Sequence, residues 1–244
     1  MIYEFVSSSR YTDTSTAIHF KLNGRRSIVV RPDHPLPGNP TVWRTEFFTA
    51  FDFVDKALLA KGWHLCYHSA SNMYGCPESL VMLREFYTFA EQTFGLNPKP
   101  VLFGFSRGGL YAVNYAHQYP DAVGALYLDA PVLDIKNWPC CVPTRREAKE
   151  CLDWYRLTWE TLPDFKEIPL NRAEEMAEKG IPVVIVAGGA DTTVVWEKNG
   201  EPFARRMRAA GGDIRVIVKP ECDHHPHSIT DVAPVTEFIE ARCL

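Results

Sequence analysis

The feature that most constrains the fold of this chain is a short glycine-rich turn that reads Gly104-Phe105-Ser106-Arg107-Gly108-Gly109. The apolar run at residues 99–103 predicts a buried strand before the turn, and the periodicity of residues 110–117 predicts a helix after it. Glycines on both sides of Ser106 remove Cβ atoms, so strand and helix can pack closely beside the serine. Strand, sharp turn and helix in this order are typical of a turn that presents a serine nucleophile.

Two other glycine-rich motifs do not fit the same stretch. The spacing G-x-G-x-x-G of a dinucleotide-binding loop is absent, and no G-K-[ST] follows as in a phosphate-binding loop. The alternative that stays open is a turn with only a structural role.

Strand and helix signals alternate along most of the chain. Residues 17–22 and 26–30 flank Asn23-Gly24, a dipeptide that favours a two-residue hairpin, so the N-terminal part predicts antiparallel strands. Further strands are predicted at residues 41–44, 63–67, 99–103, 123–128, 182–187 and 214–218. Helices are predicted at residues 46–61, 78–94, 110–120, 201–210 and 229–243. This alternation predicts a single α/β domain, residues 1–244, with a mostly parallel sheet covered on both faces.

One long segment interrupts the alternation. Residues 131–180 separate two predicted strands and exceed the length of a single crossover, so we expect a small cap inserted over the carboxyl ends of the strands. The segment contains Trp138 and Trp154, whose rings suit stacking on a sugar or aromatic group, or packing of the cap itself.

Composition narrows the partners and the compartment. The formal net charge is −4 and basic residues form only short pairs, which argues against nucleic acid as a partner. No apolar run approaches the roughly 18 residues of a membrane span. The first residues do not resemble a secretory signal, and the odd number of cysteines, 7, contains no C-x-x-C pair, so the sequence favours a cytoplasmic protein with free thiols. The oligomeric state stays open.

A serine hydroxyl needs a histidine to take its proton and an acidic residue to orient that histidine. Asp191 follows the predicted strand 182–187 through a glycine-rich turn, which suits the acid. The stretch Asp223-His224-His225-Pro226-His227 follows the last predicted strand. Its earliest histidine, His224, is the preferred base. His225 is the alternative base, and His227 is expected to support the loop.

Other assignments of these residues stay open. Asp129, at the end of the predicted strand 123–128, and Asp134 just beyond it are rival acids. The histidine cluster also suggests metal binding, but no paired cysteine or carboxylate pattern accompanies it, so we expect no metal and no cofactor. The preferred order along the chain is Ser106, Asp191, His224.

With these residues in place, the chain resembles the α/β-hydrolase fold superfamily over nearly its whole length. The resemblance implies a doubly wound α/β-hydrolase sheet and cleavage of a carboxylic ester through an acyl-enzyme. A narrower likeness rests on Trp43-Arg44, the serine turn, Asp129-Ala130-Pro131-Val132 with Trp138-Pro139, and residues 224–227. It is to a group of bacterial hydrolases, mostly without an assigned activity, some of which are associated with esters of plant polysaccharides. This likeness implies an acetyl or other ester on a carbohydrate.

The chain departs from the superfamily pattern after the predicted strand 41–44, where many members begin a loop with His-Gly. The stretch here is Trp43-Arg44-Thr45-Glu46. The resemblance then implies an oxyanion hole that combines the N–H of Arg44 or Thr45 with that of Arg107. The Arg44 side chain is expected either to contact substrate or to form a buried ion pair with Asp52, Asp55 or Glu46. The candidate substrate contacts are Trp43, Trp138, Trp154 and His225.

The expected partner is a small-molecule or oligosaccharide ester. Peptidases, thioesterases and lactone hydrolases use the same three residues, so each is an alternative. A ligand-binding protein without turnover is an alternative from another class, since a fold does not dictate function.

Overall fold

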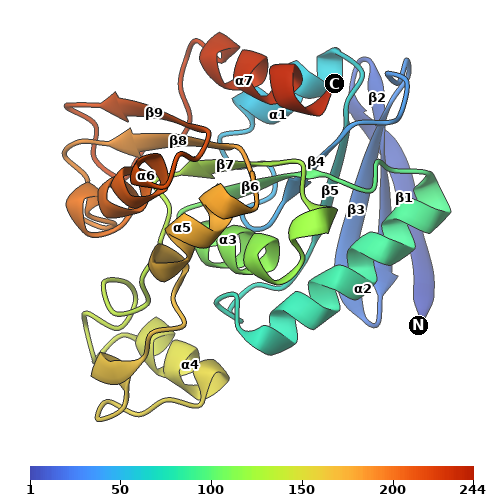
Figure 1. Cartoon of the computed structure of the whole chain (residues 1–244). Helices are drawn as coiled ribbons and strands as arrows, with labels where there is room; N and C mark the ends of the chain where they lie inside the picture. Colours follow the sequence, from blue (N-terminus) through green and yellow to red (C-terminus); the bar gives the residue numbers. More distant parts are fainter.

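A computed structural model describes all residues, 1–244, and places nine strands in one sheet (Figure 1). The strand order across the sheet is β1-β2-β3-β5-β4-β6-β7-β8-β9. The strands are β1 (Tyr3–Thr12), β2 (Ser15–Leu22), β3 (Arg25–Pro32), β4 (Thr41–Arg44), β5 (His64–His68), β6 (Val101–Phe105), β7 (Ala125–Asp129), β8 (Val183–Gly188) and β9 (Ile214–Lys219). The predicted fold class is confirmed.

The first three strands form an antiparallel meander, and β3 also pairs antiparallel with β5. Asn23 and Gly24 join β2 to β3 with φ angles of 49° and 78°, the left-handed conformation that a two-residue hairpin turn requires. From β5 to β9 every pairing is parallel, so the carboxyl ends of these strands lie at one edge of the sheet.

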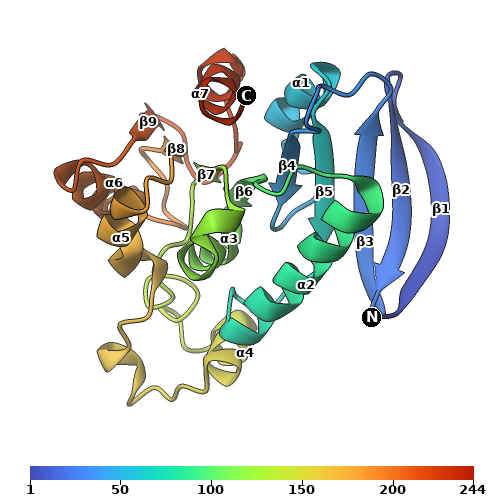
Figure 2. The same ribbon diagram turned by 45° about the vertical axis from the view of Figure 1, so that its right-hand side comes forward.

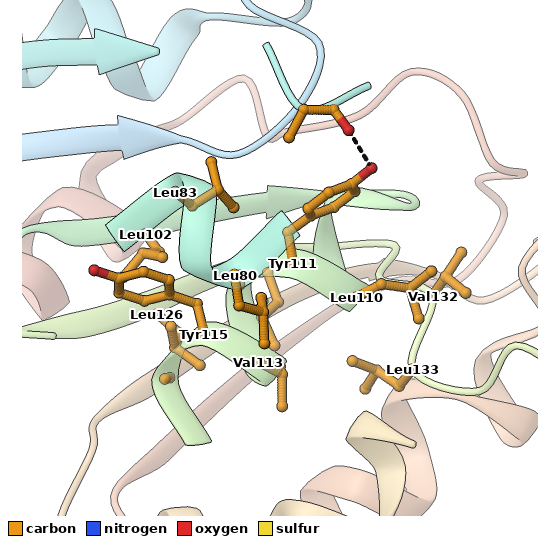
Figure 3. Close-up of a cluster of buried hydrophobic side chains, with 14 of the residues drawn as sticks. Leu80, Leu83, Leu102, Leu110, Tyr111, Val113, Tyr115, Leu126, Val132 and Leu133 are labelled. Carbon is orange, nitrogen blue, oxygen red and sulfur yellow. Dashed lines mark hydrogen bonds between the residues drawn. The ribbon is translucent and has the colours of Figure 1, made fainter. Parts of the chain in front are cut away.

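Helices cover both faces of the sheet (Figures 1 and 2). One face carries α1 (Phe53–Ala60) and α7 (Ala233–Cys243). The other carries α2 (Pro77–Phe94), α3 (Gly108–Gln118), α5 (Ala173–Glu178) and α6 (Gly200–Ala209). Side chains alternate along β6 between two buried clusters, because successive strand residues point to opposite faces. Leu102 belongs to the α2–α3 side, drawn in Figure 3, and Phe103 to the α1–α7 side.

The helix predicted at residues 46–61 is wrong in its first half. The helix α1 begins only at Phe53. Residues 47, 49 and 51 have φ angles of 52°, 75° and 49°, which no helix accommodates. The aromatic residues that suggested helical periodicity belong instead to an irregular loop that follows β4.

The predicted insertion at residues 131–180 contains two parts with different contacts. Its α5 packs with α3 and α6 in the helix layer. Its α4 (Arg146–Tyr155) lies against the start of α2, where the Tyr155 hydroxyl donates to the Tyr74 carbonyl at 2.8 Å. In the whole chain, no helix combines the length and the apolar character that crossing a membrane would require.

Two histidines of β5 are buried in the sheet. His64 is 3% exposed and His68 is 1% exposed. Burial, together with the positive charge of Arg31 near His64 and of Arg25 near His68, lowers the pKa of each imidazole to about 4. Both side chains are therefore neutral in the folded chain at neutral pH.

We expect the free energy of unfolding to fall as the pH falls from about 6.5 toward about 4. In this window the unfolded chain protonates both histidines and the folded chain does not, so protons favour unfolding by about 1–2 kcal/mol per histidine at pH 5. Urea unfolding at pH 7 and pH 5 measures the effect. The double variant His64→Gln/His68→Gln should lose less stability between the two pH values than the unaltered chain. The exposed His34→Gln variant is the control, and equal losses in all three proteins would contradict the prediction.

Candidate active site

Ser106 occupies a strained turn between β6 and α3. Its φ is 50°, in the left-handed region that is costly for a residue other than glycine. The glycines around it permit the close packing: a Cβ on Gly104 would lie 2.9 Å from the Ala112 Cβ, and one on Gly109 would lie 2.7 Å from the Pro131 Cβ. The sequence motif therefore forms the expected strand–turn–helix.

The structure brings Ser106, His224 and Asp191 together at the carboxyl edge of the sheet. The Ser106 Oγ lies 3.0 Å from His224 Nε2, and His224 Nδ1 lies 2.7 Å from Asp191 Oδ2. A carboxylate only accepts, so Nδ1 carries the imidazole proton. The Nε2 lone pair of the neutral ring then accepts the serine hydroxyl. Asp191 is 6% exposed and His224 is 8% exposed, so water competes little for these bonds.

The loops that carry the acid and the base are bonded to each other. Oδ1 of Asp191 accepts the backbone N–H groups of residues 193–194, each at 2.8 Å, which leaves Oδ2 for His224. Asp223 accepts the N–H of Thr192 at 2.9 Å and that of His224 at 2.8 Å. These two backbone bonds lower the pKa of the Asp223 carboxyl. The ionised Asp223 thus ties the histidine loop to the turn after β8.

The rival acid Asp129 has a histidine of its own. Its Oδ1 lies 2.8 Å from His227 Nδ1, and its Oδ2 accepts the N–H of Ser228 at 2.8 Å. The sequence did not predict this second Asp–His pair, and its only signal there is the presence of three histidines within four positions after the last predicted strand. Asp134, the other rival, makes no hydrogen bond to a histidine and accepts from its own turn instead.

A small pocket of about 160 Å³ opens beside Ser106. Its lining residues are Phe47, Ala50, Phe51, Phe105, Ser106, His224, His225 and His227. The wall is mainly apolar and contains no acidic side chain. His225, one of the candidate substrate contacts, thus lies at this pocket.

No residue of the predicted cap lines this pocket. Trp154 lines a separate cavity of about 560 Å³ between α4 and the helices α2 and α3. Trp138 is half-buried and packs near Tyr74, with ring centroids 6.3 Å apart. The structure therefore places both tryptophans outside the pocket that contains the serine, contrary to expectation: α4, which carries Trp154, rests on the start of α2 rather than over the serine, and Trp138 packs toward Tyr74.

The expectation that Trp43 contacts substrate is wrong, because its side chain is buried. Trp43 has no exposed surface, and its ring stacks on Tyr87 with centroids 4.8 Å apart. Trp43 is a core residue of β4.

Arg44 is also fully buried, and its side chain forms an ion pair. Nε donates to Asp55 Oδ1 at 2.8 Å, and the guanidinium lies 3.8 Å from the centroid of the Phe105 ring. The Nη2 group of Arg44 donates to the Ala50 carbonyl at 2.6 Å, inside the loop that lines the pocket. Of the two roles expected for Arg44, the geometry shows the buried ion pair.

Of the backbone donors expected near Ser106, Arg44 and Thr45 belong to the sheet, whereas the N–H of Arg107 is free. The N–H of Thr45 donates to the Phe103 carbonyl at 3.1 Å, and Arg44 lies within the ladder of β4, so neither fits the expected role. The N–H groups of Phe47 and Arg107 donate to no acceptor in the chain. Phe47 also lines the serine pocket. Its positive φ turns the backbone at this point. The sequence predicted a helix here and therefore did not identify Phe47 as a donor.

A model of the alpha/beta hydrolase fold family matches residues 29–167, more than half of the chain. The chain belongs to this family. No curated protein sequence matches the chain significantly.

Solved structures of alpha/beta hydrolases superpose on the chain at low identity. An alpha/beta hydrolase enzyme from a sediment metagenome of the Mar Chica lagoon, Morocco, gives a TM-score of 0.63 at 16% identity, covering 93% of this chain and 99% of that one. An S-formylglutathione hydrolase from Agrobacterium tumefaciens gives 0.63 at 15% identity, with coverages of 98% and 96%. Dipeptidyl peptidase 4 from Porphyromonas gingivalis gives 0.65 at 14% identity over 89% of this hydrolase and only 33% of its own length. These similarities show the fold alone.

The buried pair of Arg44 and Asp55 gives a stability prediction for this hydrolase. Asp55→Ala should lower the free energy of unfolding by about 3–5 kcal/mol, because it leaves the Arg44 charge buried without its partner. The double variant Arg44→Met/Asp55→Leu should recover much of this loss, since no charge then remains buried. Urea unfolding of the three proteins tests the pair. A double variant that is less stable than Asp55→Ala would contradict it.

Proposed function

We propose that this alpha/beta hydrolase is a serine hydrolase that cleaves carboxylic esters with a short, uncharged acyl group. The observation that carries the proposal is the continuous chain of two hydrogen bonds, 3.0 Å and 2.7 Å, from Ser106 through His224 to Asp191. It supplies a nucleophile, a base and an orienting acid in the tautomer that the chemistry needs.

The proposed reaction transfers an acyl group in two steps. His224 Nε2 takes the Ser106 proton while the serine oxygen bonds to the ester carbonyl carbon, and Asp191 stabilises the resulting imidazolium. The imidazolium then gives the proton to the leaving alcohol as the ester C–O bond breaks. Water repeats the sequence on the acyl-enzyme and releases the acid. The free N–H groups of Arg107 and Phe47 are the proposed donors to the oxyanion.

The pocket supports the choice of acyl group. A volume of about 160 Å³ and three phenylalanines in the wall suit a formyl, acetyl or similar chain better than a long or charged one. A dipeptidyl peptidase must hold the ammonium group of its substrate, and no carboxylate lines this pocket to do so.

Two kinds of substrate combine a short acyl chain with a suitable leaving group. The first is an acetylated sugar, the ester that the narrower sequence likeness favours. A thioester is the second candidate, because a structural neighbour is an S-formylglutathione hydrolase and the small pocket suits such an acyl group.

Replacing the nucleophile tests the proposal. Ser106→Ala should lower kcat for p-nitrophenyl acetate by at least about 10⁴-fold and abolish labelling by a fluorophosphonate, because the acyl-enzyme cannot form. Ser8→Ala, on the exposed strand β1, is the matched control. A panel of acetylated sugars, acetyl thioesters, lactones and peptide amides then ranks the substrates. Near-full hydrolysis by Ser106→Ala would exclude this mechanism.

The two Asp–His pairs give a second test. Asp191→Asn should lower kcat by about 10⁴-fold while the fold is kept, because an amide cannot hold the Nδ1–H tautomer of His224. Asp129→Asn should lower kcat less than about tenfold and instead reduce stability, because its carboxylate bonds to His227 and Ser228 rather than to the base. Initial rates and urea unfolding of both variants measure this. If Asp129→Asn shows the larger loss of kcat, the acid is misassigned.

A further inference from the structure

Three histidines meet at the mouth of the serine pocket. One ring nitrogen of each of His224, His225 and His227 lies within 4.8 Å of the other two. The three ring centroids are 4.8–4.9 Å apart. The proposed mechanism uses only His224 of these three rings.

We propose that His224, His225 and His227 form a binding site for a zinc ion, and that occupation of this site switches hydrolysis off. The inhibitory half of this inference rests on the proposed function, because it requires His224 to be the base. The binding half does not.

Carboxylates orient two of the three ligands. Asp191 holds the Nδ1–H of His224, and Asp129 holds that of His227, at 2.7 Å and 2.8 Å. Each neutral ring therefore presents the lone pair of Nε2. A carboxylate on the far nitrogen is the usual outer partner of a zinc-bound histidine, since it fixes the ring and strengthens the ligand. The two buried carboxylates also supply negative charge close to the cation.

His225 is the free ligand of the set. It is exposed, and neither of its ring nitrogens makes a hydrogen bond within the chain. Its ring stacks on Phe51, with centroids 5.5 Å apart and planes at 17°.

Small movements complete the geometry. Zinc–nitrogen bonds of about 2.0–2.1 Å in a tetrahedral site place the nitrogens about 3.4 Å apart. In the present structure one nitrogen of each ring lies within 4.8 Å of the others, so binding zinc requires the three rings to draw closer together, and the exposed His225 ring is the one that no hydrogen bond holds. Three imidazoles leave a fourth position for water, and the Ser106 hydroxyl, now 3.0 Å from His224 Nε2, loses its bond to that nitrogen when zinc occupies it.

Zinc and the serine compete for the same lone pair. When Nε2 of His224 binds the metal, it cannot accept the proton of Ser106, and the nucleophile is no longer activated. Zinc should therefore inhibit reversibly, and a chelator should restore the activity.

The binding test uses Ser106→Ala, which removes hydrolysis but keeps the three histidines. Calorimetric titration of this variant with zinc chloride should show saturable binding at one site that depends on His225. Adding His225→Ala should weaken that site by more than about tenfold, because one of three ligands is lost. Adding His34→Ala, an exposed histidine outside the cluster, should leave it unchanged. The seven free cysteines are the same in all these proteins, so their own zinc binding cancels in the comparison. Equal zinc affinity with and without His225 would overturn the inference.

The inhibition test uses the chain with Ser106 intact. Hydrolysis of p-nitrophenyl acetate is measured with zinc and with EDTA, and each variant is compared with its own rate in EDTA. His225→Ala should raise the zinc concentration for half-inhibition by more than about tenfold. Inhibition that does not depend on His225 overturns the switch. Zinc binding to Ser106→Ala without any esterase activity in the unaltered chain would instead refute the proposed function and leave the metal site standing.

Discussion

Two buried carboxylates at the ends of neighbouring strands hold the histidine loop, and the geometry of the site depends on them. Parallel pairing aligns Asp129 with Val186, so the turn that follows β8 brings Asp191 to the same edge of the sheet. Each carboxylate uses one oxygen for a histidine Nδ1 and the other for backbone N–H groups. A buried carboxylate is stable only when its oxygens are satisfied in this way. The loop is therefore held in place by the same bonds that compensate the burial of these charges.

Asp129 also links the base loop to the nucleophile. Its backbone carbonyl accepts the N–H of Ser106 at 2.8 Å, while its side chain holds His227. The Ser106 carbonyl in turn accepts the N–H of Val132 at 2.9 Å. These main-chain bonds hold the serine in its left-handed conformation, which costs about 1–3 kcal/mol and persists only where the surroundings enforce it. One residue thus couples the position of the serine to that of the histidines.

The parts that the sequence predicted are those governed by local rules. A few neighbouring residues are enough to predict the turn around Ser106, the Asn23-Gly24 hairpin turn and the apolar strands. The structure contains each of them. The placement of Ser106, Asp191 and His224 followed from strand ends meeting at one edge. The helix prediction was wrong at residues 45–52, because the aromatic residues there have helical spacing but line the pocket and pack on the core instead. The pair of Asp129 and His227 spans 98 positions, a contact that no local pattern reveals.

A histidine that acts as a general base and one that binds zinc need the same hydrogen-bonding environment and differ only in the group beside Nε2. Both need an imidazole whose Nδ1 proton is held by a carboxylate and whose Nε2 lone pair is free. His224 and His227 both meet this requirement, so their surroundings alone do not separate catalysis from metal binding. The group that lies beside the Nε2 lone pair distinguishes the two roles. With a serine hydroxyl beside it, His224 can act as a base, whereas with two other imidazoles beside it, His224 can act as a zinc ligand. In the proposed zinc site the exposed His225 supplies the third imidazole, and the lone pair of His224 then binds the metal instead of the serine hydroxyl.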